Sequence, residues 1–355
     1  MAQIGYSRRQ VALGRRGMVA AAHPLATLAG VEVLRAGGTA ADAAVAVNAV
    51  LAVTQPNMCG VGGDFFCLYY EAATRRVHFL NGGGRSGSRA GLDELTRRGM
   101  ERLPVIGPAT VSVPGCVRAW AMLLERFGTR PLDELLAPAI GAAEGFPLTS
   151  LVSQAIQEYA AVTPDAEWHR VFVPGGRVPQ LGDLFSQPDL ARTLRELAAE
   201  GPDLFYAGRV GRAIARRLER DGFLTADDLA AHTGEWGEPI STTYRDVTVY
   251  ETPPPTQGLA ALLGLNLLEG FPLATLPIHS AEHLHLLIET VKLAYADRDR
   301  WIGDPAHARV PVGALLAKDY AARRRAQFDP EKAQSYACGD PEGDTDGRQR
   351  GAQGP

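Results

Sequence analysis

A glycine-rich turn followed by an acidic residue is the first place in this chain where the residue types could support chemistry. Gly60-Val61-Gly62-Gly63 stands directly before Asp64. Such a turn can cradle a phosphate, but no Lys-Ser or Lys-Thr pair follows it, and it leads into a predicted strand instead of a helix. Nucleotide binding is therefore disfavoured. Asp64 either helps to organise an active site or caps backbone amides in the turn.

Three histidines lie close together later in the chain, at His279, His283 and His285. His279 and His283 would share one face of a helix, which could suit a metal ion. However, the glutamate that directly follows the first histidine in zinc proteases is absent. Ser280 is predicted to be the N-cap of the helix, which leaves His279 outside it. We therefore predict no metal site.

Asp297-Arg298-Asp299-Arg300 alternates in charge near the predicted end of the same helix. We interpret these residues as ion pairs of the kind that contributes little individually.

The hydrophobic pattern predicts the elements that must position these residues. Residues 25–36 carry apolar side chains at helical spacing, and residues 40–53 are almost all Ala and Val, which predicts two packed helices. Residues 65–70 and 76–80 predict the two strands of a hairpin, and residues 243–250 predict one further strand.

The composition excludes several classes of protein. The 355 residues are 46% hydrophobic and carry a formal net charge of −4. This allows a large buried core and gives no reason to expect a nucleic-acid partner. No segment approaches the roughly 18 consecutive apolar residues that cross a bilayer, so no membrane association is expected.

Cysteine usage and the N-terminus favour a cytoplasmic location. The four cysteines have neither the spacing of a zinc site nor the density of a disulfide scaffold, which favours a reducing compartment; they are Cys59, Cys67, Cys116 and Cys338. Ser7-Arg8-Arg9 could begin a twin-arginine export signal, but Arg15 and Arg16 interrupt the apolar stretch that such a signal requires. Residues 1–16 are therefore predicted to be a basic arm.

Several motifs occur in an order that resembles one enzyme family. They are Gly60-Val61-Gly62-Gly63-Asp64-Phe65-Phe66, Val113-Pro114-Gly115, Gly201-Pro202-Asp203-Leu204-Phe205-Tyr206-Ala207-Gly208, Thr252-Pro253-Pro254-Pro255-Thr256-Gln257-Gly258 and Ala294-Tyr295-Ala296-Asp297-Arg298. Together they resemble the large-subunit portion of the gamma-glutamyltranspeptidase family. These are N-terminal nucleophile hydrolases, and they include glutathione hydrolases and cephalosporin acylases.

The resemblance implies a fold and a partner. The fold class is α+β, the four-layer αββα sandwich of the N-terminal nucleophile hydrolases, and residues 17–330 would supply its large-subunit part. A small subunit that carries an N-terminal threonine nucleophile would complete it. No metal or organic cofactor is implied. Residues 331–355 are polar, with almost nothing apolar to bury, and are predicted to be a disordered tail near the self-cleavage site.

The candidate nucleophile follows from the same resemblance. Family members cut themselves just before a threonine, whose hydroxyl becomes the nucleophile and whose freed amine can act as its base. Gly343-Asp344-Thr345 resembles the approach to this site, although Asp346 stands where the family has a second threonine. Thr345 is therefore either at the nucleophile position or a threonine in a polar tail. Because the strand that should follow is missing from the sequence, we expect the chain to be inactive by itself, as a processed subunit, a truncated gene product or a pseudo-enzyme.

The resemblance also implies a substrate-binding arginine in the large subunit. A guanidinium pairs there with the alpha-carboxylate of a glutamyl substrate, since its planar donors match a carboxylate. The corresponding stretch is Asn81-Gly82-Gly83-Gly84-Arg85; if Asn81 matches the family aspartate, the arginine position falls on Gly83 and Arg85 is displaced by two residues. We predict that Arg85 is a substrate-binding residue in the pocket, with Arg89 as the second candidate. The alternative is that both are solvated loop arginines.

The predicted function is that of the large subunit of a gamma-glutamyltransferase-like enzyme. It would cleave gamma-glutamyl amides of the glutathione type through an acyl-enzyme and pass the acyl group to water or to an amine. If the arginine clamp is absent, a glutaryl or other N-acyl amide is the expected substrate. A truncated, non-catalytic relative and a stand-alone nucleotide-binding protein are the alternatives from other classes.

Overall fold

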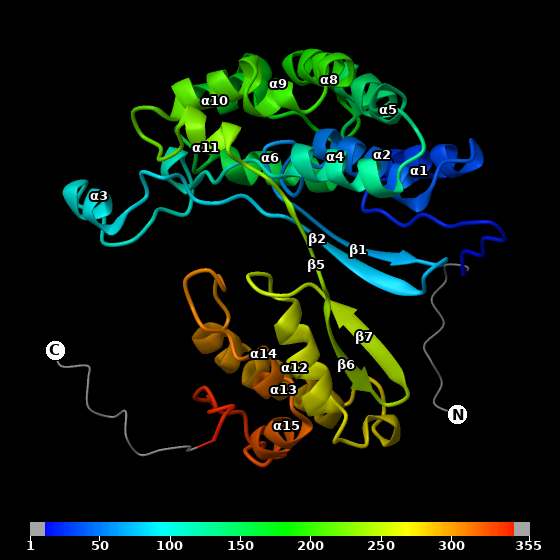
Figure 1. Ribbon diagram of the computed structural model, residues 1–355, viewed down its shortest axis with the longest axis vertical. Coiled ribbons are helices and arrows are strands. Elements are labelled where there is room, and N and C mark those ends of the chain that lie inside the picture. The colour runs from blue at the N-terminus through cyan, green and yellow to red at the C-terminus, as the bar shows by residue number, and fades with distance from the viewer. Residues whose placement is uncertain (1–10, 344–355) are drawn as a thin grey trace. The chain divides into compact units, whose positions relative to one another are not determined.

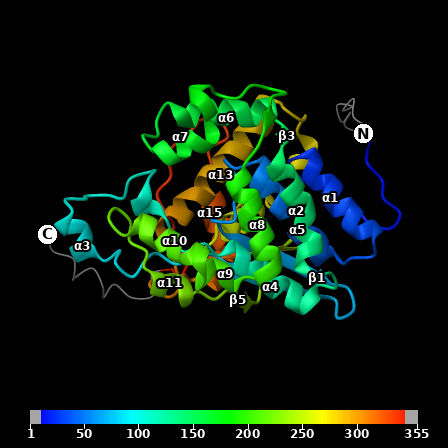
Figure 2. The same ribbon diagram turned by 90° about the horizontal axis from the view of Figure 1, so that it is seen from above.

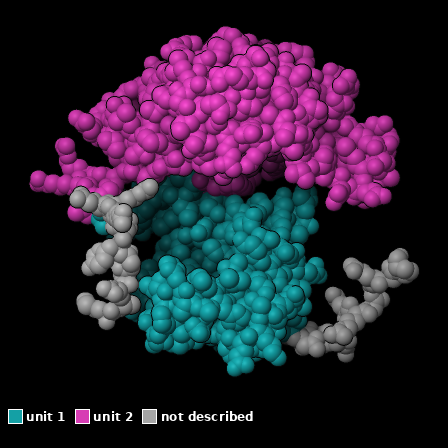
Figure 3. Space-filling model, turned by 180° about the vertical axis from the view of Figure 1, so that it is seen from behind, with its two compact units in different colours: residues 1–11, 67–79, 237–355 teal, residues 12–66, 80–236 magenta. Residues whose placement is uncertain are grey.

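The structure is a computed structural model that describes residues 11–343, and these residues belong to two compact units (Figure 1). Of the described residues, unit 1 contains Val11, Cys67–Phe79 and residues 237–343, and unit 2 contains Ala12–Phe66 and Leu80–Trp236. Figure 3 colours unit 1 teal and unit 2 magenta. The domain boundaries near residues 17 and 330 stay predictions.

Three strands form one sheet in the order β1-β2-β5. They are β1 (Phe65–Glu71), β2 (Arg76–Gly82) and β5 (Glu235–Gly237). The predicted hairpin is confirmed, because β1 and β2 are neighbours and Arg75 makes the turn between them at a φ of 57°. β5 lies beside β2 although it comes much later in the chain, which no local pattern predicts.

Helices dominate unit 2. They are α1 (Pro24–Arg35), α2 (Ala40–Thr54), α3 (Leu92–Arg97), α4 (Cys116–Phe127), α5 (Leu132–Glu144), α6 (Ser150–Ala160), α7 (Ala166–Phe172), α8 (Pro188–Glu200), α9 (Asp203–Tyr206), α10 (Arg209–Leu218) and α11 (Ala226–Ala230). Two short strands, β3 (Phe146–Pro147) and β4 (Leu184–Phe185), pair antiparallel. Two 3-10 turns complete the unit, at Pro108–Thr110 and Pro174–Gly176.

The predicted helices of residues 25–36 and 40–53 are confirmed as α1 and α2, which lie side by side (Figures 1 and 2). α2 also packs against α4 and α5, and α5 packs against α8. The small side chains of α2 permit this close approach on several sides; Ala41, Val45 and Ala46 are fully buried.

Asp42 connects α2 to the turn that follows α4. Its side chain is fully buried, and Oδ2 accepts the backbone N–H of Thr39 at 2.7 Å, which completes a capping box. The backbone N–H of Thr129 donates to Oδ1 at 2.9 Å, and the Thr129 hydroxyl donates to Oδ2 at 2.9 Å. Burial alone would raise the pKa of Asp42, but the hydrogen bonds from Thr39, Thr129 and Arg130 together lower that pKa.

Unit 1 is a hairpin and a group of helices. Its elements after the shared sheet are β6 (Ile240–Tyr244), β7 (Val247–Glu251), α12 (Gly258–Leu268), a 3-10 turn (Leu273–Thr275), α13 (Ala281–Trp301), α14 (Val312–Leu315) and α15 (Lys318–Arg325). Leu259, Leu263 and Leu267 of α12 form a core with Leu293 of α13 and Tyr320 of α15.

The prediction of one strand over residues 243–250 is wrong. β6 and β7 are antiparallel partners, with Tyr244 opposite Val247, and the chain reverses between them. Arg245 makes the reversal at a φ of 54°, a conformation that is uncommon for a residue with a side chain. Because neither Arg245 nor Asp246 is a glycine, the sequence carries no strong signal for this turn.

The interpretation of Asp297 as one of several minor ion pairs at a helix end is also wrong. The Asp297 and Arg324 side chains are only 2% and 3% exposed, and their charged atoms lie 3.1 Å apart. The Tyr320 hydroxyl donates to Asp297 Oδ2 at 2.8 Å, and the backbone N–H of Gly339 donates to Oδ1 at 2.7 Å. Asp297 is therefore a buried, fully partnered carboxylate.

The predicted disorder of the tail is wrong for residues 331–343. The Tyr336 hydroxyl donates to Glu289 Oε2 at 2.8 Å, and the Trp301 indole N–H donates to the carbonyl of Gly339 at 3.0 Å. Because Glu289 is itself 1% exposed, this segment is fixed to α13 by buried polar partners despite its polar composition. Thr345 lies outside the described residues.

Within residues 11–343, no helix is both long and apolar enough to cross a membrane.

We predict that Asp42→Ala lowers the free energy of unfolding by about 2–4 kcal/mol, because it leaves several buried donors without an acceptor. Urea unfolding followed by circular dichroism measures this loss. Glu125→Ala, at an exposed position of α4, is the control and should change the free energy by less than about 0.5 kcal/mol. Equal effects of the two substitutions would contradict the role given to Asp42.

Candidate functional site

The glycine-rich turn of residues 60–63 and the start of α4 meet at the level of the backbone. The carbonyl of Gly63 accepts hydrogen bonds from the backbone N–H groups of Gly115 at 3.0 Å and of Cys116 at 2.9 Å. These two N–H groups belong to the first turn of a helix, which has no partners for them within the helix. The turn therefore caps α4, and it leads into a strand, so it does not have the arrangement of a phosphate cradle.

The loop that follows β2 also packs closely against the segment before α4. The backbone N–H of Val113 donates to the carbonyl of Arg85 at 2.9 Å. A Cβ atom added at Gly84 would overlap the carbonyl of Val113, and one added at Gly115 would overlap the carbonyl of Gly82. Glycine is required at these two positions because the backbones approach too closely for any side chain.

Asp64 fixes the same loop. Its Oδ1 accepts the backbone N–H of Gly84 at 2.8 Å. Of the two roles proposed from the sequence, the structure shows the capping of a backbone amide, and this cap lies one residue before Arg85. Asp64 therefore helps to position the predicted substrate-binding arginine.

Arg85 extends into solvent from this fixed loop. Its side chain is 82% exposed, and Nη2 lies 3.3 Å from Oε1 of Glu235, which is also exposed. An exposed pair of this kind contributes about 0–1 kcal/mol, so a carboxylate of a ligand could replace Glu235 at little cost. The geometry is compatible with the predicted role, and that role stays a prediction.

Gly83, the position to which the family arginine would map, has little room for a side chain. A Cβ atom there would lie 3.0 Å from Cζ of Phe66 and 3.1 Å from Oδ1 of Asn81. Asn81 Oδ1 already accepts the backbone N–H of Gly83 at 3.0 Å. A side chain at residue 83 would therefore require the Phe66 ring to shift slightly, and Arg85 is the first arginine that follows in this loop.

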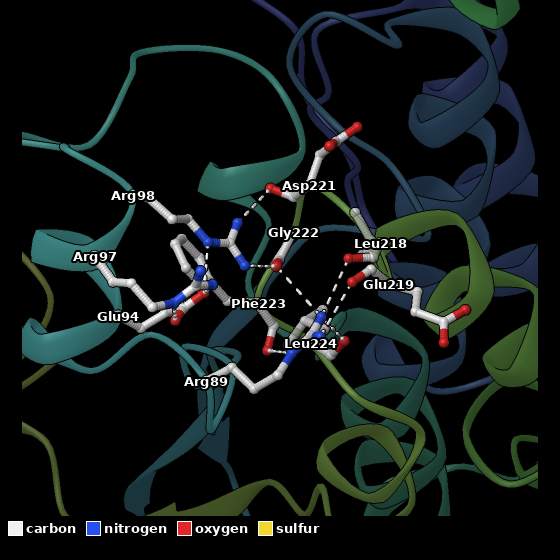
Figure 4. Close-up of polar contacts among 10 residues, drawn as sticks. All are labelled: Arg89, Glu94, Arg97, Arg98, Leu218, Glu219, Asp221, Gly222, Phe223 and Leu224. Atoms are coloured by element: carbon white, nitrogen blue, oxygen red, sulfur yellow. Dashed lines mark hydrogen bonds and ion pairs between the residues drawn. The ribbon is translucent and has the colours of Figure 1, made fainter.

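Arg89 has a different environment (Figure 4). Its guanidinium donates to the backbone carbonyls of five residues at 3.1–3.4 Å; these residues are Leu218, Glu219, Gly222, Phe223 and Leu224. Its donors are therefore occupied in holding the turn after α10. Arg85 and Arg89, the two candidate substrate-binding residues, do not converge on one partner.

Arg98 reinforces the same turn. It donates to the carbonyls of Asp221 at 3.2 Å and Gly222 at 3.3 Å, and its guanidinium lies 4.4 Å from the centre of the Phe223 ring. Figure 4 shows Arg89 and Arg98 reaching the turn from one segment of the chain. Arg89 and Arg98 thus tie the segment of residues 85–98 to residues 218–224.

His232 is a residue near this loop that sequence reasoning missed. It is 6% exposed, its ring stacks on Tyr206 with the ring centres 5.6 Å apart, and its buried Nε2 has no hydrogen-bond partner among the described residues. Burial lowers the pKa of His232; the positive charges of Arg118 and Arg85 lower it further, and Asp64 opposes them. No motif marks this histidine, because it comes near Arg85 only through the placement of β5 beside β2.

Cys116 is near the glycine turn but is not suited to nucleophilic chemistry. Burial raises the pKa of its thiol well above the ordinary range, and Sγ donates to Asn48 Oδ1 at 3.3 Å. Trp120 donates its indole N–H to the same oxygen at 2.9 Å. The thiol therefore stays protonated and serves the packing of α4 on α2.

The histidines examined as metal ligands are separated by the start of a helix. Ser280 is the N-cap of α13, with its hydroxyl accepting the backbone N–H of His283 at 3.2 Å, and His279 precedes it, as predicted. His285 bonds to the carbonyl of Asp329 at 2.8 Å. In the described part of the chain, no group of His, Cys, Asp and Glu residues could hold a metal ion.

Comparison with known proteins agrees with the motifs and the fold. The family model described as gamma-glutamyltranspeptidase matches residues 26–352. The glutathione hydrolase-like YwrD proenzyme of Bacillus subtilis is 38% identical over 315 residues, which are 87% of this chain and 59% of that protein. The acylase ACY 1 proenzyme of Pseudomonas sp. (strain SE83) is 39% identical over 343 residues, which are 93% of this chain and 62% of that protein.

The chain belongs to the gamma-glutamyltranspeptidase family. The structure of Helicobacter pylori gamma-glutamyltranspeptidase superposes with a TM-score of 0.85 at 28% identity and covers 97% of this chain and 99% of that one. The predicted α+β fold of the N-terminal nucleophile hydrolases, in its large-subunit part, is thereby confirmed. The chain spans about three fifths of the length of the two curated relatives.

We predict that Arg89→Ala lowers the free energy of unfolding by about 2–3 kcal/mol, because five carbonyls at and after the end of α10 each lose a hydrogen-bond donor. Arg85→Ala, which removes the same side chain from an exposed position four residues earlier, should change it by less than about 0.5 kcal/mol. Urea unfolding of both variants measures the difference. A similar loss in both would contradict the separation of their roles.

We predict that His232 makes stability depend on pH. Because its pKa is lowered in the folded chain, stability is full above the unfolded pKa and is lost as the pH falls through that value towards the folded pKa. Between about pH 7 and about pH 5, the wild-type protein should therefore lose more free energy of unfolding than His232→Gln. His307→Gln, at an exposed histidine, is the control and should retain the wild-type pH dependence.

Proposed function

We propose that this chain is the large-subunit part of a gamma-glutamyltransferase-like N-terminal nucleophile hydrolase. It would act with a small subunit that carries an N-terminal threonine nucleophile. The two curated relatives are named as proenzymes, one a glutathione hydrolase-like protein and one an acylase, which supports both the cleavage of amides and the proteolytic processing. Thr345 remains the proposed nucleophile position.

The observation that carries the proposal is the exposed guanidinium of Arg85 on a fixed loop. Asp64 and Val113 hold the backbone on both sides of it, through hydrogen bonds of 2.8 Å to Gly84 and 2.9 Å to the carbonyl of Arg85. A rigid backbone and a free planar donor set are what the recognition of a substrate carboxylate requires. Arg85 would bind and orient the acyl donor, and it would take no part in proton transfer.

The proposed reaction is acyl transfer. The threonine hydroxyl attacks the amide carbonyl of the donor while the threonine amine accepts the hydroxyl proton. The amide C–N bond then breaks, the leaving amine takes up that proton, and the acyl group remains as an ester on the threonine. Attack on this ester by water or by an acceptor amine releases the acyl group and restores the hydroxyl.

Two acyl donors fit a carboxylate-binding arginine. A gamma-glutamyl group and a glutaryl group both end in a carboxylate, and they differ in that only the gamma-glutamyl group has an ammonium beside it. A simple N-acyl group lacks both. The shift from residue 83 to residue 85 relative to the family pattern is the reason to keep a glutaryl amide as the second candidate donor.

The experiment begins with the protein purified from its own source. Intact mass spectrometry determines whether a second chain that begins with threonine accompanies it, and hydrolysis of gamma-glutamyl, glutaryl and simple acyl anilides identifies the donor. A second chain with turnover supports the proposal. A protein with neither a second chain nor turnover would contradict it and leave a non-catalytic relative.

We predict that Arg85→Ala raises KM for the preferred carboxylate-bearing anilide about ten- to a hundredfold, because a charged hydrogen bond to the substrate is lost. Arg76→Ala is the matched control, since Arg76 is also an exposed arginine paired with a glutamate, Glu238, at 3.0 Å. Kinetics of both variants with the small subunit present measure the effect. An unchanged KM in Arg85→Ala would remove Arg85 from the substrate pocket.

We also propose a cytoplasmic location. Cys59, Cys67, Cys116 and Cys338 are all free thiols, which supports a reducing compartment. Cell fractionation with an antibody against the chain tests this, and recovery in the exported fraction would contradict it.

A further inference from the structure

A cavity of about 390 Å³ lies beside Arg89 in unit 2, between α10 and the segment that begins α11. Three of its lining residues are arginines, Arg89, Arg212 and Arg216, and one is acidic, Glu219. Figure 4 shows Arg89 and Glu219 at the turn that follows α10. The formal net charge of the residues that line the cavity is therefore +2. Arg85 itself does not line this cavity.

None of the three arginines has a carboxylate partner among the described residues. The Arg89 guanidinium donates only to backbone carbonyls, and the one side-chain hydrogen bond of Arg212 to a described residue goes to the carbonyl of Ala207 at 2.9 Å. The guanidinium of Arg216 has no hydrogen bond or ion pair to another described residue. Carbonyl dipoles do not cancel a full positive charge, so the charges in the cavity are uncompensated.

The neighbouring arginines that do not line the cavity are all paired. On α10, Arg209 pairs with Glu196, and Arg217 pairs with Asp165 at 2.6 Å. Just after the helix, Arg220 pairs with Asp221 at 3.1 Å. Of the described arginines on α10, only Arg212 and Arg216, which line the cavity, lack an acidic partner. The dipole of α10 favours a cation in its last turn, which accounts for Arg216 and Arg217 but not for Arg89 and Arg212.

We propose that this cavity binds a small polyanion through clustered phosphate or carboxylate oxygens. The guanidinium groups of Arg212 and Arg216 offer paired donors to either anion, whereas Arg89 contributes mainly its charge, because its donors are occupied by backbone carbonyls. Two or more negative charges on the ligand would neutralise the excess. The volume lies in the range of small-molecule sites. Arg89 is already held in place by the carbonyls of residues 218–224, so one of the three charges is fixed before the anion arrives.

Isothermal titration calorimetry of the full chain tests the proposal. The probes are inorganic phosphate and citrate, each at constant ionic strength set with sodium chloride. Arg212→Gln and Arg216→Gln remove the exposed cavity charges, and Arg217→Gln is the matched control, since it removes one charge from the same helix outside the cavity. Circular dichroism establishes that all variants fold.

We expect saturable binding that weakens at least tenfold in Arg212→Gln and Arg216→Gln and changes less than about twofold in Arg217→Gln. Saturable binding of phosphate alone would indicate a ligand that bears phosphate groups. Saturable binding of citrate alone would indicate a polycarboxylate ligand. Saturable binding of both would indicate that the cavity recognises the oxygens that phosphates and carboxylates share. Absence of saturation with both probes would overturn the proposal. An equal loss in Arg217→Gln would also overturn it, because binding would then follow net charge and not the cavity.

Discussion

The candidate site depends on a close approach of three backbone segments in unit 2. Gly84 and Gly115 lie where a Cβ atom would overlap the carbonyl of a neighbouring segment, and the carbonyl of Gly63 caps the first turn of α4. These contacts leave the loop after β2 very little freedom, and Asp64 removes more by holding the amide of Gly84. The direction in which Arg85 leaves the loop is therefore set by backbone packing, before any contact of its own side chain.

Buried carboxylates join helices to neighbouring segments in both units. Asp42 joins α2 to the turn after α4 in unit 2, and Asp297 joins α13 to α15 and to Gly339 in unit 1. Each accepts several N–H or O–H groups, so the cost of burying the charge is offset by charge-assisted hydrogen bonds to both carboxylate oxygens. Glu289 and Asp297 also anchor Tyr336 and Gly339 in the last described segment of the chain.

The sequence predicts local elements well and long-range placement poorly. Periodicity and Ala-rich composition identified α1 and α2, and alternation identified β1 and β2, because these signals depend on neighbours in the chain. The β6–β7 turn was missed because Arg245 adopts a positive φ without being a glycine. The sequence did not reveal His232 or the burial of Asp297, because their partners are distant in sequence. The polar composition of residues 331–343 predicted disorder because the buried groups that hold this segment are also distant in sequence.

Arg85 and Arg89 show why residue type and spacing alone do not assign a site. Both are arginines in one glycine-rich loop, yet Arg89 directs its donors to carbonyls of the turn after α10, whereas Arg85 keeps one exposed contact to Glu235. A guanidinium already saturated by the backbone has few donors left for a substrate carboxylate, and an exposed one has most of them. If a substrate carboxylate is recognised in this part of the family fold, the group free to do it is Arg85, and Arg89 acts on it only by holding the loop.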